Sequence, residues 1–159
     1  MNKSDLLTQI IASLHVGLEA LQNAARASHA EATHESSKPE NKYDTRGLEA
    51  AYLAGGQARQ AREILDSIKI YGAMQVKAFG PGDSIELSAL VEIEADRSRS
   101  FYFIGPKSGG LEFAMDGQEV TVITPQSPLG QSLMGKKAGE RWTSGTGRSI
   151  VKYRIVSVS

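Results

Sequence analysis

The feature that most constrains this chain is a regular apolar pattern near its start. Apolar residues here recur at alternating spacings of four and three positions, and they are Leu7, Ile11, Leu14, Leu18, Leu21 and Ala25. This spacing puts them on one face of an α-helix and is typical of a coiled-coil seam. Ser4 is a suitable N-cap, so we predict a helix that ends at about Thr33 and is roughly 45 Å long at ~1.5 Å per residue.

The partner for that apolar face is predicted within the same chain. Residues 34–45 break the pattern with residues that favour turns, namely Ser36, Ser37, Lys38, Pro39 and Asn41. Apolar residues resume along residues 48–68, so a second helix is predicted to begin near Asp44 or Thr45. Two amphipathic helices joined by a short connection pack as antiparallel neighbours. The sequence therefore predicts a coiled-coil hairpin with its tip near residues 34–44.

The rest of the chain follows a different period. Polar and apolar residues alternate along residues 84–93, as they do in a half-buried strand. Further strands are predicted at residues 100–104, 118–123, 139–143 and 149–158. Between the strands at 118–123 and 139–143, Ser127 is predicted to be the N-cap of a short helix, with Pro128 as its first residue and Gly135 as its end. The pattern predicts an antiparallel sheet that carries one short helix, so the fold class is α+β.

Composition excludes several classes of function. The 18 Lys and Arg residues balance 18 Asp and Glu residues, so any nucleic-acid binding would require a local basic patch or a protein partner. The chain has no cysteine and no apolar run near the ~20 residues that span a bilayer, and its N-terminus lacks the features of a secretory signal. These features indicate a cytoplasmic protein without a membrane partner. His29 and His34 are five positions apart, which does not suit a zinc site on one helix face.

Residues 123–140, with the sequence ITPQSPLGQSLMGKKAGE, resemble the C-terminal signature of the Gre family of bacterial transcription elongation factors. The segments FIGP at 103–106 and YRIV at 153–156 fall where that family has strands. The resemblance implies a hairpin domain at residues 1–73 and a Gre-type, FKBP-like C-terminal domain at residues 74–159. It also implies RNA polymerase core as the partner, with nucleic acid contacted only indirectly in the elongation complex, and regulation of transcription as the role.

The hairpin tip resembles the family more loosely. The segment ENKYD at 40–44 is similar to the acidic tip element with which family members enter the polymerase secondary channel. There the tip carboxylates help hold a Mg²⁺ that the polymerase uses to hydrolyse backtracked RNA, so the factor needs no metal or cofactor of its own and is not itself an enzyme. Glu40 matches the family's acidic position, and the second acid falls near Ser37 here. Glu35 and Asp44 are the substitutes, with Asn41 and Tyr43 as further binding residues.

The same resemblance implies that the C-terminal domain docks on the polymerase through its short helix and the turn that follows. The expected binding residues there are Ser127, Pro128, Leu129 and Lys136. Three functions stay open: a factor that promotes transcript cleavage, a channel-binding regulator that does not, and an FKBP-like interaction or isomerase domain. A monomer is expected, although the same heptads would also serve an intermolecular coiled coil.

Overall fold

The structure, a computed structural model, describes residues 1–33, 46–80, 82–96, 98–144 and 150–159. Their contacts divide the chain into two compact units. The sheet unit consists of Met1–Ile10 and Ala73–Ser159, and the hairpin unit consists of Ile11–Gly72. The sequence predicts a boundary near residue 73, and by contacts the sheet unit also takes in Met1–Ile10.

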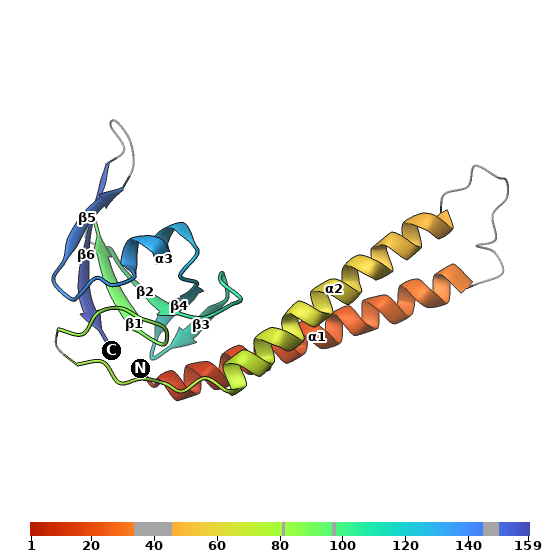
Figure 1. Cartoon of the computed structure of the whole chain (residues 1–159), viewed down its shortest axis with the longest axis horizontal. Helices are drawn as coiled ribbons and strands as arrows, with labels where there is room; N and C mark the ends of the chain where they lie inside the picture. The colour runs from red at the N-terminus through yellow and green to blue at the C-terminus, as the bar shows by residue number, and fades with distance from the viewer. Residues whose placement is uncertain (34–45, 81, 97, 145–149) are drawn as a thin grey trace. The chain divides into compact units, whose positions relative to one another are not determined.

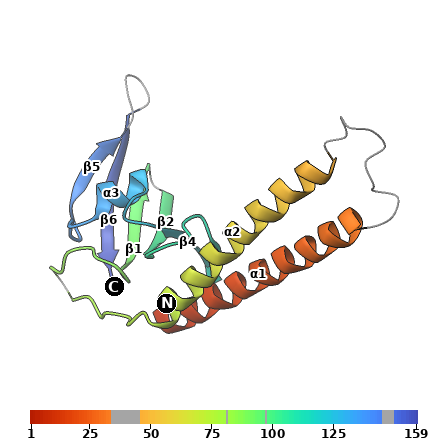
Figure 2. The same cartoon turned by 45° about the vertical axis from the view of Figure 1, so that its right-hand side comes forward.

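Two long helices form the hairpin, and they lie side by side in both Figure 1 and Figure 2. α1 spans Lys3–Thr33 and α2 spans Arg46–Gly72. Within the hairpin unit, a Cβ placed on Gly17 of α1 would lie 3.8 Å from Cδ1 of Ile64 in α2. Leu14 and Leu18, in the middle of the apolar seam, are buried. The predicted helical hairpin is confirmed.

The cap at the start of α1 differs from the prediction. The backbone N–H of Ser4 donates to Oδ1 of Asn2 over 2.9 Å, so Asn2 is the capping residue and the helix begins at Lys3. Ser4 lies inside the helix, where its backbone carbonyl accepts a hydrogen bond from the Thr8 hydroxyl. The prediction of Ser4 as the N-cap is wrong because Asn2, an equally good acceptor, precedes it.

The sheet unit contains a 6-stranded sheet in the order β3-β4-β2-β1-β6-β5. Its strands are β1 (Leu90–Ala95), β2 (Ser98–Ile104), β3 (Glu112–Met115), β4 (Gln118–Ile123), β5 (Arg141–Ser144) and β6 (Val151–Val158). The short helix α3 spans Pro128–Leu133. This arrangement of a helical hairpin followed by a sheet with one short helix confirms the α+β class.

The prediction of a wholly antiparallel sheet is wrong at one pair. β2 pairs with β4 in parallel, whereas the other neighbouring strands are antiparallel. β3, which the sequence pattern missed, lies at the sheet edge and turns tightly into β4 through Asp116 and Gly117, both with positive φ. This turn reverses the chain, so β4 returns beside β2 in the same direction as β2. Asp-Gly is a strong hairpin signal that could have revealed β3.

The strand predicted at residues 84–93 is shorter than expected. Of the predicted residues, only 90–93 join the ladder, in β1, and the segment before them forms other hydrogen bonds. The N–H of Ile85 donates to the carbonyl of Lys136 over 2.8 Å, and the N–H of Gly135 donates to the carbonyl of Ile85 over 2.9 Å. Ile85 and Ala89 are fully buried, so their alternation in the sequence reflects burial rather than strand pairing.

The principal core of the sheet unit lies on the face that α3 covers. Its buried members are Ile85, Ala89, Val91, Ile93, Ile104, Ile123, Leu133 and Ile155. Because side chains alternate along a strand, Glu92 and Glu94 of β1 point to the opposite face. The sheet unit therefore has an apolar side built around α3 and a charged side over β1, β6 and β5.

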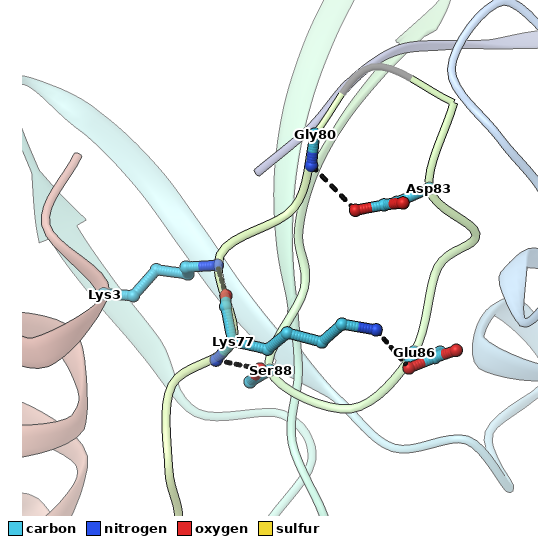
Figure 3. A network of polar contacts seen from close by, with 6 residues as sticks. All are labelled: Lys3, Lys77, Gly80, Asp83, Glu86 and Ser88. Atoms are coloured by element: carbon cyan, nitrogen blue, oxygen red, sulfur yellow. Dashed lines mark hydrogen bonds and ion pairs between the residues drawn. The ribbon is translucent and has the colours of Figure 1, made fainter.

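A polar network joins the first turn of α1 to the segment that leads into β1 (Figure 3). Nζ of Lys3 donates to the carbonyl of Lys77 over 2.6 Å, and the N–H of Lys77 donates to the buried hydroxyl of Ser88 over 3.0 Å. Both ammonium groups also lie over the ring of Phe79, at 4.8 and 5.1 Å from its centroid. These contacts explain why Met1–Ile10 belongs to the sheet unit.

The two lysines respond differently to this network. Burial lowers the pKa of Lys3, whereas a hydrogen bond to Glu86, with Nζ and Oε2 2.8 Å apart, raises the pKa of Lys77. Nearby, the N–H of Gly80 donates to Oδ2 of Asp83 over 2.8 Å and closes the turn (Figure 3).

Among the residues that the structure describes, no helix combines the length and the apolar character needed to cross a membrane.

Candidate functional site

Ser127 has a structural role at the start of α3. Its backbone is extended (φ −66°, ψ 153°), and its Oγ accepts a hydrogen bond from the N–H of Gly130 over 3.1 Å. The same hydroxyl donates to the carbonyl of Thr124 over 2.8 Å. Pro128 follows at the first helical position, where its missing N–H costs nothing. The predicted cap is confirmed, and both hydrogen-bonding functions of the Ser127 hydroxyl are used within the fold.

Gly130 is tightly enclosed by the backbone that precedes α3. A Cβ at this position would lie 1.9 Å from the carbonyl oxygen of Thr124, far inside contact distance. The helix therefore rests directly on the backbone that precedes it, and only glycine allows this approach. A close approach at Gly130 was not predicted from the sequence, although Gly130 follows the predicted N-cap serine by three positions.

The side chains of α3 divide between core and surface. Leu133 is fully buried in the core, and Leu129 and Met134 are partly buried against it. Pro128 is exposed. Of the binding residues expected on this helix, Pro128 thus presents an apolar surface to solvent, whereas much of the Leu129 side chain is buried against the core.

The turn after α3 is held from both sides. Gly135 has a positive φ of 78° that favours glycine, and its N–H and the Lys136 carbonyl form the two hydrogen bonds to Ile85. The Lys136 side chain is 31% exposed, with Nζ 3.8 Å from Oε2 of Glu140. Lys136 and Pro128 are the accessible residues of the expected docking set, on a backbone fixed by hydrogen bonds.

The tip residues Glu35, Glu40, Asn41, Tyr43 and Asp44 lie outside the residues that the structure describes. Their expected roles in Mg²⁺ sharing and channel binding stay predictions. Within the described ranges, no group of three or more His, Asp or Glu side chains is placed to hold a metal ion.

The charged side of the sheet unit contains two ion pairs between neighbouring strands. Nη2 of Arg154 lies 2.6 Å from Oε2 of Glu94, and Nη1 of Arg99 lies 2.7 Å from Oε1 of Glu92. The hydrogen bond and the charge of Arg154 lower the pKa of Glu94, and Arg99 and Arg141 add to the effect. This charged surface was not predicted from the sequence, although Lys152 and Arg154 are two positions apart in a predicted strand and therefore share a face.

Comparison with known families decides where the chain belongs. Residues 80–159, half of the chain, match the model described as "Transcription elongation factor, GreA/GreB, C-term". The chain belongs to the GreA/GreB family of transcription elongation factors. The match covers all six strands and α3, so the GreA/GreB assignment includes the α3 surface, and it confirms the resemblance drawn from the sequence.

Similar solved structures carry related names. They include Gfh1 of Thermus aquaticus (22% identity, covering 92% of this chain and 92% of that one, TM-score 0.38). The GreA factor homolog 1 (Gfh1) of Thermus thermophilus is also similar (24% identity, 94% of each chain, TM-score 0.37). A GreA/GreB factor from Nitrosomonas europaea shares 18% identity over 74% of this chain and 95% of that one, with a TM-score of 0.37.

TM-scores this low carry no argument about the arrangement of the whole chain, so the family assignment rests on residues 80–159. A search of curated proteins finds no match.

Proposed function

We propose that this chain binds bacterial RNA polymerase and inserts the tip of its hairpin into the secondary channel. The observation that carries the proposal is the family match over residues 80–159, because the matched segment contains the expected docking helix. The hairpin unit adds the pair of long helices that such a probe needs. In this role the protein modifies the chemistry of the polymerase, and it works as a monomer in the cytoplasm with the polymerase.

The docking surface of this proposal is the exposed side of α3 together with the turn that follows. Pro128 supplies a rigid apolar contact and Lys136 a cation, on a backbone that the Ser127 cap and the Ile85 hydrogen bonds hold in place. A fixed surface loses little conformational freedom on binding, which favours affinity. Leu129 contributes mainly by supporting this surface from the core side.

At the tip, Glu40 with Asp44 or Glu35 would contribute carboxylate oxygens to a Mg²⁺ that the polymerase also holds. Mg²⁺ prefers such ligands in octahedral geometry, and shared metal sites activate water for phosphodiester hydrolysis. Isolated carboxylates bind Mg²⁺ weakly, so this chemistry requires the polymerase ligands.

A second candidate function is regulation in the same channel without cleavage. The sequence favours it in one respect: the basic residues Lys38, Lys42 and Arg46 alternate with the tip acids and reduce the local negative charge. The upstream acid of the family pattern is also not reproduced, since its expected place falls near Ser37. Transcript cleavage thus separates the two candidates.

Docking is tested by measuring the affinity of the whole protein for core polymerase. We expect Lys136→Glu to weaken binding at least tenfold, while Lys152→Glu on the charged side of the sheet unit leaves it within twofold. Thermal unfolding of both variants confirms that each is folded. Equal affinity of Lys136→Glu and the unaltered protein would remove α3 and its turn from the interface, and absence of polymerase binding by the unaltered protein would overturn the proposed function itself.

Cleavage is tested on stalled, backtracked elongation complexes with Mg²⁺ present. The cleavage hypothesis expects the protein to shorten the transcript from its 3′ end, and expects Glu40→Gln to abolish shortening while polymerase binding persists. Asp44→Asn and Glu35→Gln then identify the second carboxylate. Binding to polymerase without shortening of the transcript would support the regulator hypothesis instead. A protein that does not bind polymerase but forms a concentration-dependent dimer would support the hypothesis of an FKBP-like interaction domain.

A further inference from the structure

The first turn of α1 is held by a lysine that has no carboxylate partner among the described residues. Lys3 takes part in none of the ion pairs of the described ranges. Its Nζ donates instead to the backbone carbonyl of Lys77 over 2.6 Å (Figure 3), and it lies 4.8 Å from the centroid of the Phe79 ring. Partial burial lowers the pKa of Lys3, so these two contacts compensate for lost hydration.

The backbone that accepts this hydrogen bond is itself fixed. The N–H of Lys77 donates to Oγ of Ser88 over 3.0 Å, and the N–H of Ser88 donates to the carbonyl of Ile104 in β2 over 2.9 Å. Further along the same segment, Ile85 is fully buried and forms the two hydrogen bonds to the turn after α3. Lys3 is therefore attached to a carbonyl that the sheet holds in place.

The Phe79 ring is shared by two cations whose charges are balanced in different ways. Nζ of Lys77 lies 5.1 Å from the ring centroid and is paired with Oε2 of Glu86 at 2.8 Å. Because Glu86 balances that charge, repulsion between the two ammonium groups is reduced. The charge of Lys3, in contrast, is stabilised by a carbonyl dipole and by the aromatic ring. Both of these contacts depend on the position of the Lys3 ammonium group.

The other contacts at the base of α1 constrain its position less sharply. Its buried apolar side chains pack without a preferred direction. Gln9 donates to Sδ of Met115 over 3.1 Å, and sulfur is a weak acceptor. The amino group of Met1 lies 3.0 Å from Oδ2 of Asp116, a side chain that is 69% exposed, and exposed ion pairs contribute little. Lys3 therefore supplies a directional constraint that these contacts do not replace.

α1 carries this constraint from one unit into the other. It is a single helix over Lys3–Thr33, of which the part up to Ile10 belongs to the sheet unit and the part from Ile11 belongs to the hairpin unit. The helix contains no proline, and helices without a specific cause of a kink bend only gently. Holding the first turn therefore restricts the motion of the rest of α1.

We propose that Lys3 is a positioning residue for the hairpin, and that its ammonium group restrains α1 on the sheet unit through the Lys77 carbonyl and the Phe79 ring. The inference rests on the proposed function in one respect: a restrained hairpin loses less conformational freedom when it enters the secondary channel. Lys3 then governs how well the tip acts after docking, and the affinity of the α3 surface does not depend on it.

The first test measures hairpin motion in the whole protein without polymerase. The chain has no cysteine, so Gln22→Cys in α1 and Thr143→Cys in β5, both at exposed positions, can carry the two dyes of an energy-transfer pair. Single-molecule measurements give the distribution of dye separations. Lys3→Met keeps an apolar stem and removes the charge, so we expect it to widen this distribution by about 1.5-fold or more.

Two further variants separate this role from general destabilisation. Lys3→Arg keeps a cation and its donors, so we expect it to retain the original width. Lys152→Met removes an exposed cation from the charged side of the same unit and should also leave the width unchanged. Thermal unfolding checks that each labelled variant is folded. An unchanged width in Lys3→Met, or equal widening in Lys3→Arg, would overturn the proposal.

A double variant tests whether Lys3 acts through Phe79. Phe79→Leu keeps a side chain that can pack against the core and removes the ring. We expect it to widen the distribution less than Lys3→Met does, because the Lys77 carbonyl still accepts the hydrogen bond. Adding Phe79→Leu to Lys3→Met should then have little further effect, since both changes remove one contact. Fully additive effects would contradict the contact between ammonium group and ring.

Polymerase provides the second readout. The affinity of Lys3→Met for core polymerase should stay within about twofold of that of the unaltered protein, because the α3 surface is unchanged. Its maximal effect on transcript shortening or nucleotide addition, at saturating protein, should fall about threefold or more. An undiminished maximal effect, or a loss of docking, would overturn the positioning role. If the unaltered protein does not bind polymerase, the proposed function fails, while the energy-transfer measurement still decides whether Lys3 restrains α1.

Discussion

Two glycine-containing helices show how differently the two units are built. In α3 of the sheet unit, the space where a Gly130 side chain would begin is already occupied by the Thr124 carbonyl. In α2 of the hairpin unit, a Cβ on Gly55 or Gly56 would meet nothing within 4 Å. At Gly130 the backbone outside α3 leaves no room for a side chain, whereas the surroundings of Gly55 and Gly56 in α2 leave room for one. Gly130 lies within residues 80–159, the part of the chain that matches the family model.

The largest effect is expected from Gly130→Ala. A Cβ at 1.9 Å from a backbone oxygen cannot be accommodated unless α3 moves off the Thr124 carbonyl, and such overpacking costs about 3 kcal/mol or more. Urea unfolding of the purified protein measures the loss. A cost below about 1 kcal/mol would mean that the α3 segment adapts as easily as α2, and the contrast between the two helices would fail.

Ser127→Ala is the next largest change. It removes the acceptor for the Gly130 N–H and the donor to the Thr124 carbonyl, and the loss of an N-cap costs roughly 1 to 2 kcal/mol. Ser127→Thr keeps both groups and is the matched control in the same unfolding assay. If Thr is as destabilising as Ala, the hydroxyl is not what holds the start of α3.

Gly55→Ala is expected to stabilise the protein, in contrast to the two preceding substitutions. Ala is favoured over Gly by about 1 kcal/mol in a helix interior, and the site is open, so we expect the hairpin unit to become more stable by up to about that amount. Helix content by circular dichroism during thermal unfolding provides the measurement, with Gly56→Ala as a replicate at the adjacent open site. Destabilisation at both sites would reveal a close neighbour of α2 and break the comparison.

The smallest effect concerns the charged side of the sheet unit, where Glu94 pairs with Arg154. This pair lowers the pKa of Glu94 in the folded state below its ordinary value of 4.5. A lowered folded-state pKa adds stability that is fully present above the unfolded-state pKa and is lost as the pH falls through the folded-state value. The stability difference between the unaltered protein and Glu94→Gln should therefore shrink as the pH decreases from 6 to about 3.

Chemical denaturation at several pH values in that range supplies the data. Because the pair is partly exposed to solvent, added salt should reduce the difference as well. A difference that is independent of both pH and salt would mean that Glu94 contributes by packing, as the α3 residues do, rather than by charge.

The sequence predicts some elements of the fold well because their signals are local. The α1 seam, the Ser127 cap and Gly135 each reveal an element from its own residues. Long-range partners leave weaker signals: Ile85 looks like part of a strand although its backbone bonds to the turn after α3. The parallel pairing of β2 with β4 depends on where β3 turns, which no periodicity encodes. Gly130 is recognisable as essential only once the Thr124 carbonyl is seen beside it.

The candidate sites also differ in whether their residues are adjacent in the sequence or brought together by the fold. Ser127, Pro128, Leu129 and Lys136 could be named from the sequence because they are adjacent in one family motif, but their division into surface and core could not. On the charged side of the sheet unit, Glu94 and Arg154 are 60 positions apart in the sequence, and only the pairing of β1 with β6 makes them neighbours. The pairing of Glu40 with a second carboxylate at the tip, from Asp44 or Glu35, stays a prediction from the sequence.

The pairing of β1 with the last strand of the chain, β6, has a consequence during protein synthesis. β1 lies between β2 and β6, and Arg154 follows Glu94 by 60 residues. At about 5 to 20 residues per second, the ribosome needs roughly 3 to 12 s to add that stretch, and until then β1 is an edge strand that another nascent chain could pair with. Glu92 and Glu94 place negative charge along this temporary edge, and we expect this charge to hinder its pairing with another chain until β6 is added.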